Sequence, residues 1–193
     1  MDTLTLASEL TGRPVVTLGG DLVAEVKDTV FDGLAGRITG FTLNGRGLLA
    51  GPLKESLPWS AVHALGRNAV MIPGREALAE PAAVLPPGKD TGGAVVGIRV
   101  LTDAGREAGT VRDVVVEPDG KVAGFQIVAA DALDHRRRTV FIPRDEALAA
   151  SGQALVVSDD ASRFVAQDLP SFTAQVENFR ARRAGHPVGK EHP

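Results

Sequence analysis

Two stretches decide the fold, Gly12-Arg13-Pro14-Val15-Val16-Thr17 and Gly97-Ile98-Arg99-Val100-Leu101-Thr102, because the second repeats the first 85 residues later. Further matches follow in the same order: Gly20 with Gly105, Val26-Lys27-Asp28 with Val111-Arg112-Asp113, and, after a slip of one residue, Gly40-Phe41-Thr42-Leu43 with Gly124-Phe125-Gln126-Ile127. Similarity that keeps one order across about 65 residues predicts an internal duplication.

The duplication predicts two domains, at residues 1–74 and 93–160. Residues 75–92 are expected to form the linker between them, because Pro81, Pro86 and Pro87 restrict the backbone there and remove donors. Residues 161–193 are expected to form a C-terminal helix and a flexible tail.

Each repeat is predicted to be all-β, with five or six short strands divided by turn residues. In the second repeat, Pro118-Asp119-Gly120 is a hairpin turn that leads into a strand at 122–129. Short helical turns are expected at 61–65 and 145–150, with Ser60 and Asp145 as their N-caps. So small a sheet avoids exposed edges by closing, which predicts two tandem small β-barrels.

Composition narrows the classes of function. The 24 acidic and 21 basic side chains give a net charge of -3, which argues against a non-specific nucleic-acid binder. There is no cysteine, which excludes disulfides, zinc–thiolate sites and thiol catalysis. No two of the four histidines have the spacing of a metal site, so we expect no metal, no cofactor and no enzyme activity. Without an export signal or a long apolar run, the expected location is the cytoplasm.

Five residues are structural candidates. Asp28 and Asp113 occupy equivalent strand positions. They could form a carboxylate site that is repeated in each domain. Their recurrence favours the alternative, in which each carboxylate accepts backbone N–H bonds at a turn or bulge. Pro58 and Pro143 end equivalent strands. Trp59 either closes the end of a barrel as core or lies half-exposed at an interface.

The densest basic run, made of Arg136, Arg137 and Arg138, is a candidate interaction surface. It could bind RNA phosphates or an acidic patch on a partner. Because Asp131 and Asp134 stand beside it, a solvated, charge-balanced connection is the alternative that we favour.

The C-terminal helix, expected at 171–183, is the second candidate surface. Its apolar stripe consists of Phe172, Val176 and Phe179, and its last turn carries Arg180, Arg182 and Arg183. The stripe must be buried against something. Its own barrel is the favoured cover, and a partner, a second subunit or a membrane surface are the alternatives.

Several motifs resemble the PRC-barrel superfamily, over residues 1–74 and 93–160. They are the opening Ala7-Ser8-Glu9-Leu10 with Gly12, the two Val-Lys/Arg-Asp strands, Leu57-Pro58-Trp59-Ser60-Ala61-Val62, and Ile142-Pro143 with the segment 154–157. The resemblance implies a small, non-enzymatic β-barrel that contacts proteins, as in the cytoplasmic domain of the photosynthetic reaction-centre H subunit and in ribosome-maturation factors of the RimM type. The membrane helix of the former and the separate RNA-processing domain of the latter have no counterpart here.

From these observations we expect a non-catalytic interaction scaffold that acts through surface contacts with protein partners or with a second copy of itself. The alternative is an RNA- or ribosome-associated assembly or processing factor. An enzyme that acts on a small molecule or depends on a metal is the least favoured class.

Overall fold

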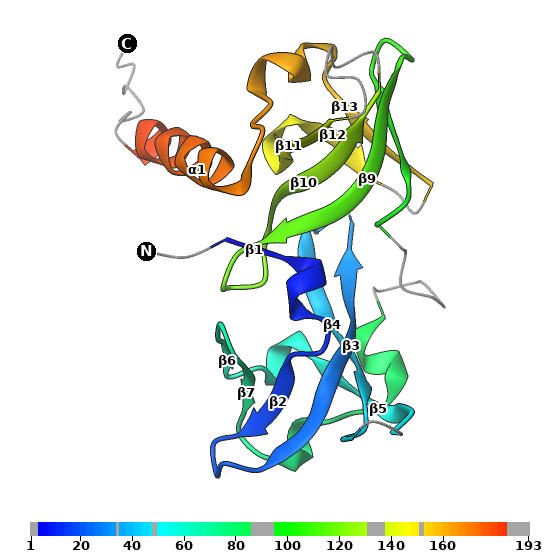
Figure 1. Ribbon diagram of the computed structural model, residues 1–193, viewed down its shortest axis with the longest axis vertical. Helices are drawn as coiled ribbons and strands as arrows, with labels where there is room; N and C mark the ends of the chain where they lie inside the picture. Colours follow the sequence, from blue (N-terminus) through cyan, green and yellow to red (C-terminus); the bar gives the residue numbers. More distant parts are fainter. Residues whose placement is uncertain are drawn as a thin grey trace, which may run out of the picture.

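In a computed structural model, the described part of the chain forms two β-sheets and one long helix. The structure describes residues 4–33, 35–47, 50–85, 95–130, 138–150 and 153–184, without the side chains of 150, 162–164 and 179–184. Figure 1 shows the sheets stacked along the long axis, the first in blue and cyan and the second in green and yellow.

The first sheet has the strand order β5-β4-β3-β2-β7-β6. Its strands are β2 (Pro14–Thr17), β3 (Leu22–Asp32), β4 (Arg37–Asn44), β5 (Pro52–Pro58), β6 (Ala64–Leu65) and β7 (Val70–Ile72). Neighbouring strands are antiparallel except β2 and β7, which run parallel.

The second sheet repeats this topology strand for strand, in the order β11-β10-β9-β8-β13-β12. Its strands are β8 (Arg99–Thr102), β9 (Glu107–Val116), β10 (Val122–Ala129), β11 (Thr139–Pro143), β12 (Ala147–Ala150) and β13 (Ala154–Val157). The pair β8 and β13 is again the parallel one. The shared topology agrees with the duplication expected from the sequence.

Closure into barrels stays a prediction. Among the described residues, no hydrogen-bonded ladder joins the outer strands β5 and β6, or β11 and β12. The apolar faces are shielded in another way, because buried side chains of both sheets form one continuous cluster that extends from Val15 and Phe41 to Val100 and Leu155. The mostly-β class is therefore confirmed, and the two domains share a core.

The N-terminus of the first domain crosses to the second sheet. Strand β1 (Thr5–Leu6) pairs with β9, and a 3₁₀ helix, η1 (Ala7–Leu10), follows it. The Ser8 N–H donates to the Asp113 carboxylate at 3.2 Å, and Leu10 is fully buried in the shared core. This crossing ties the first domain to the second by contacts that do not involve the linker.

Equivalent turns of the two repeats hydrogen-bond to each other. The Ile38 N–H donates to the carbonyl of Gly120 at 2.8 Å, and the Val122 N–H donates to the carbonyl of Gly36 at 2.9 Å. Ile38 and Val122 are equivalent in the two repeats, as are Gly36 and Gly120. The contact is therefore reciprocal, as in a symmetric dimer, but both halves belong to one chain.

Two local predictions are wrong. Residues 64–65 and 147–150, expected to lie in helical turns, form β6 and β12, because pairing with β7 and β13 overrides the helix propensity of alanine and leucine. Neither Ser60 nor Asp145 caps a helix. Both lie inside single 3₁₀ turns, η2 (Trp59–Ala61) and η6 (Arg144–Glu146), whose preceding residues, Pro58 and Pro143, make no side-chain cap bond.

The segment expected to be a linker begins with two 3₁₀ helices, η3 (Arg75–Ala77) and η4 (Pro81–Val84), that pack on the first sheet. Ser56 and Ala79 exchange backbone hydrogen bonds of 2.8 Å. Val84 is buried over Gly40, where an added Cβ would lie 3.0 Å from the Val84 Cβ. Residues 86–92 lie outside the described part of the chain.

Candidate interaction groove

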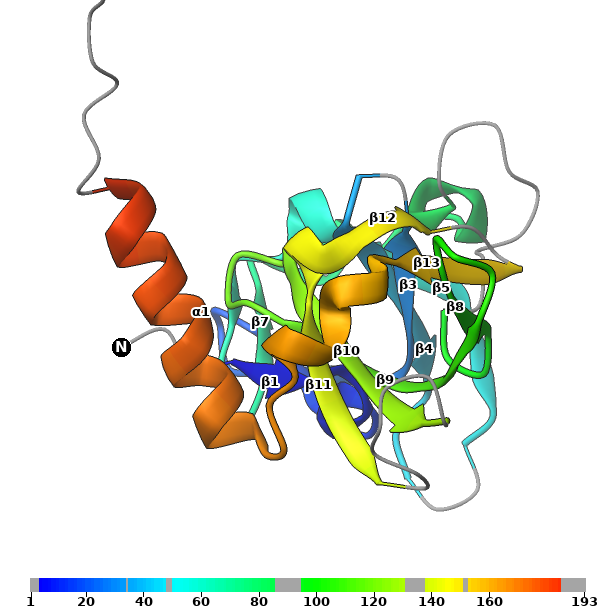
Figure 2. The ribbon, with the colours of Figure 1, turned by 90° about the horizontal axis from the view of Figure 1, so that it is seen from above.

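The C-terminal helix α1 (Leu169–Ala184) docks on the second sheet of its own chain, beside β1 and β11 (Figure 2). Phe172 is fully buried, with its ring 5.7 Å from that of Phe141 and above Gly124 of β10. Val176 is half-buried in the same small cluster. Two residues of the expected stripe, Phe172 and Val176, therefore pack on the second domain of the same chain. The side chain of the third residue, Phe179, lies outside the described part.

The same spot is covered in both domains. Gly40 and Gly124 are equivalent, and an apolar side chain lies over each, Val84 in the first domain and Phe172 in the second. In each domain this side chain belongs to a segment that follows the sheet in the sequence. In the first domain the segment is the short η4, and in the second it is the long helix α1. No helix in the described part of the first domain corresponds to α1.

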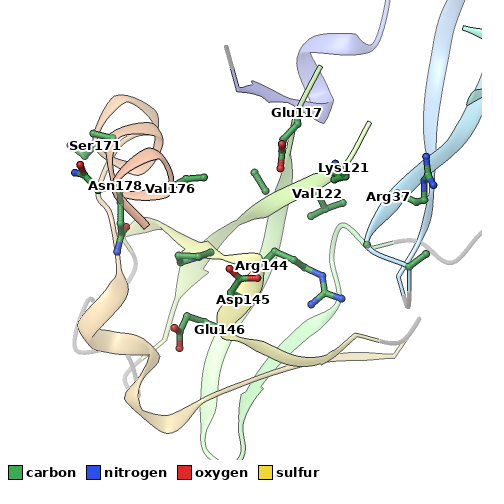
Figure 3. A pocket seen from close by; sticks show the side chains of 16 residues that line it. Arg37, Glu117, Lys121, Val122, Arg144, Asp145, Glu146, Ser171, Val176 and Asn178 are labelled. Atoms are coloured by element: carbon green, nitrogen blue, oxygen red, sulfur yellow. The ribbon is translucent and has the colours of Figure 1, made fainter. Parts of the chain in front are cut away.

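A groove of about 1140 Å³ lies between α1, the second sheet and the β3–β4 turn of the first domain (Figure 3). Its floor is apolar and includes Val122 and Ala123 of β10 and Pro143 of β11. The helix contributes an uncharged wall: Ser171, Ala174, Gln175, Val176 and Asn178. The groove therefore joins both domains and the helix in one surface.

Charged side chains surround the groove in two groups. Arg37, Lys121 and Arg144 gather near the contact between the domains, and Asp145 and Glu146 lie on the side toward the helix (Figure 3). Burial raises the pKa of the Glu146 carboxyl, and the neighbouring carboxylates of Asp145 and Asp160 raise it further. Glu117 completes the charged lining.

The groove lies at the half of the reciprocal contact that holds Arg144, where the two repeats differ. Trp59 lies over Gly120 and 6.2 Å from Phe41, so it is half-buried at a contact between the domains. At the equivalent place in the second repeat, Arg144 lies over Gly36. A flexible guanidinium and a rigid indole ring therefore occupy equivalent places in the two repeats.

The paired aspartates have different environments. Asp113 is buried, and its carboxylate accepts N–H bonds from Val114 at 2.8 Å and from Ser8 at 3.2 Å. Asp28 is exposed, and its carboxylate accepts the Thr42 hydroxyl at 3.2 Å. Each follows an irregularity in the strand register. The backbone N–H bonds of the architectural interpretation are present at Asp113, whereas the Asp28 carboxylate accepts from a side-chain hydroxyl. In the described residues, His, Cys, Asp and Glu side chains form no cluster of three or more that could hold a metal ion.

The basic candidates stay predictions. Arg136 and Arg137 lie outside the described residues, and Arg138 is exposed just before β11. Arg180, Arg182 and Arg183 lie on the last turns of α1, where the structure describes the backbone alone. No helix in the described part of the chain is long and apolar enough to cross a membrane.

The sequence does not predict the groove, because its lining comes from residues 35–37, β10, η6 and α1, which are far apart in the chain. One signal was present. In the repeat alignment, Trp59 after Leu57-Pro58 falls on Arg144 after Ile142-Pro143, and this exchange marks where the halves differ.

Comparison with known proteins agrees with the duplicated fold. The family description of the PRC-barrel domain matches the chain twice, at residues 2–79 and 92–169. A search of curated proteins finds no match. Since the two matches together span most of the chain and coincide with the two sheets, the chain belongs to the PRC-barrel domain family and carries two copies of the domain.

Proposed function

We propose that this protein is a non-catalytic interaction scaffold and that the groove beside α1 is where it contacts a protein partner. The observation that carries the proposal is the make-up of the groove, an apolar floor inside a polar and charged rim. Protein–protein contact surfaces have this arrangement, because the apolar centre is desolvated and the rim stays in water.

The groove residues also favour binding over catalysis. The described lining contains no histidine and no cysteine, the side chains that most often serve as general base or thiol nucleophile. The raised pKa of the Glu146 carboxyl is explained by its burial and by the neighbouring carboxylates. Membership of the PRC-barrel family is consistent with this proposal.

Site-specific photo-cross-linking in the source cells tests the proposal. A photoreactive amino acid replaces Ala174, which is exposed in the groove wall, and in the matched control it replaces Lys54, which is exposed on β5. We expect a discrete protein adduct from position 174 that is absent from position 54 and that survives nuclease treatment.

Two other results would speak against this function. An adduct that disappears with nuclease would favour the alternative, an RNA- or ribosome-associated factor. Equal labelling at both positions, or no adduct at either, would contradict the use of this groove as a docking site.

A further inference from the structure

Two arginines that line the groove are without a carboxylate partner in the described part of the chain. Arg144 is half-buried, lies over Gly36, and donates from Nη1 to the Ala147 carbonyl at 3.3 Å. Arg37 is exposed on the β3–β4 turn. A partly desolvated cation is stabilised when an anion lies beside it, so this end of the groove favours an anionic group in whatever fills it.

The helix wall favours a peptide backbone as the rest of the occupant. The side chains of α1 that line the groove carry no charge, and the amide of the exposed Asn178 can both donate and accept hydrogen bonds, as the groups of a peptide backbone require.

The shape of the groove selects an extended segment over a folded face. The floor at Val122 and Ala123 lies between α1 on one side and the β3–β4 turn of the first domain on the other. A flat protein surface would meet these two walls before it reached the floor, whereas a single extended chain can lie between them.

We propose that the groove docks an extended acidic segment of a partner protein, with an Asp or Glu side chain paired to Arg144, with Arg37 as a second cation of the lining, and with its backbone along α1. This inference rests on the function proposed above and names the kind of partner. Asp145 and Glu146 belong to the same turn as Arg144 and lie on its side toward the helix, where they disfavour a second acidic group.

Peptide display on the full-length protein tests the inference. Phage that carry random nonapeptides are selected on the unaltered chain, and the selected peptides are then titrated against Arg144→Glu, Arg37→Glu and Arg67→Glu. Arg67 is exposed in the turn between β6 and β7 and is not part of the groove, so its variant carries the same charge change elsewhere.

We expect the selected peptides to be rich in Asp and Glu and to lose affinity about tenfold or more on the two groove variants, the scale of a charged hydrogen bond, but not on Arg67→Glu. Replacing the acidic residue of the peptide by Lys should restore affinity for Arg144→Glu. Selected peptides without acidic enrichment, or equal losses on all three variants, would overturn the inference. If position 174 still cross-links to a partner that lacks an acidic segment, the proposed function stands and this inference alone fails.

Discussion

Gly36 and Gly120 offer a matched experiment inside one chain. Both are in the left-handed region, at φ of 63° and 82°, and both take part in the reciprocal turn contact. They differ in what an added Cβ would meet, which is the guanidinium of Arg144 at Gly36 and the indole ring of Trp59 at Gly120. Alanine at each position therefore compares a flexible neighbour with a rigid one.

The expected costs follow from these contacts. The left-handed conformation costs an alanine about 1–2 kcal/mol at either site. At Gly36, the nearest atom is the Arg144 Nε at 2.9 Å, and this side chain can move away. At Gly120, the Trp59 Cζ2 lies 2.5 Å from the added Cβ, and moving a packed ring adds about 1–3 kcal/mol. Gly120→Ala should therefore cost about 2–5 kcal/mol in total.

Urea unfolding measures both costs, and Trp59→Ala provides the control background. Without the indole, Gly120→Ala should cost no more than Gly36→Ala, because the conformational cost alone remains. Because the two domains share one core, each variant should unfold in a single transition. Equal costs for the two glycines in the unaltered chain would refute the assignment of Trp59 as an anchor between the domains.

Three further predictions concern the anchors of the fold. Phe172→Ala removes a fully buried ring and should cost about 3 kcal/mol, with loss of hydrogen-exchange protection in α1. Asp113→Ala leaves buried N–H groups without an acceptor and should cost about 1–3 kcal/mol by thermal unfolding, whereas Asp28→Ala, at the exposed equivalent position, should cost less than about 0.5 kcal/mol. The hydrogen bond from Arg106 lowers the pKa of the Asp159 carboxyl, so the stability that it contributes is complete above the ordinary carboxyl pKa and is lost as the pH falls through the lower native value. The unfolding midpoint of Asp159→Asn should accordingly depend less steeply on pH below about pH 4 than that of the unaltered chain.

Much of the fold was accessible from the sequence because it depends on local, repeated signals. The turn at 118–120 and the strand Val122–Ala129 were placed at their observed positions, since Pro, Asp and Gly mark a turn whatever surrounds it. The strand β12 was not predicted, because its residues, Ala147-Leu148-Ala149-Ala150, favour a helix by themselves. Pairing with β13, which no local pattern encodes, decides their conformation.

The candidate site was less accessible for the same physical reason. The stripe on α1 correctly indicated a buried face, and Phe172 fills it. The groove requires that α1, β10 and the turn at 35–37 be brought together by the contact between the two domains. Hydrophobic periodicity indicates which face of a helix or strand is buried. It does not indicate which other element lies beside the exposed face.

The exchange of Trp59 for Arg144 at equivalent positions has a consequence for how this protein can evolve. In a dimer of identical subunits, every substitution appears on both sides of the symmetry axis, so a residue that opens one binding surface also removes the opposite anchor. In this chain the two positions are encoded separately. One half can hold the pair of domains together while the other is free to change. On the proposed function, mutations at Arg144 then alter recognition without weakening the joint that Trp59 maintains.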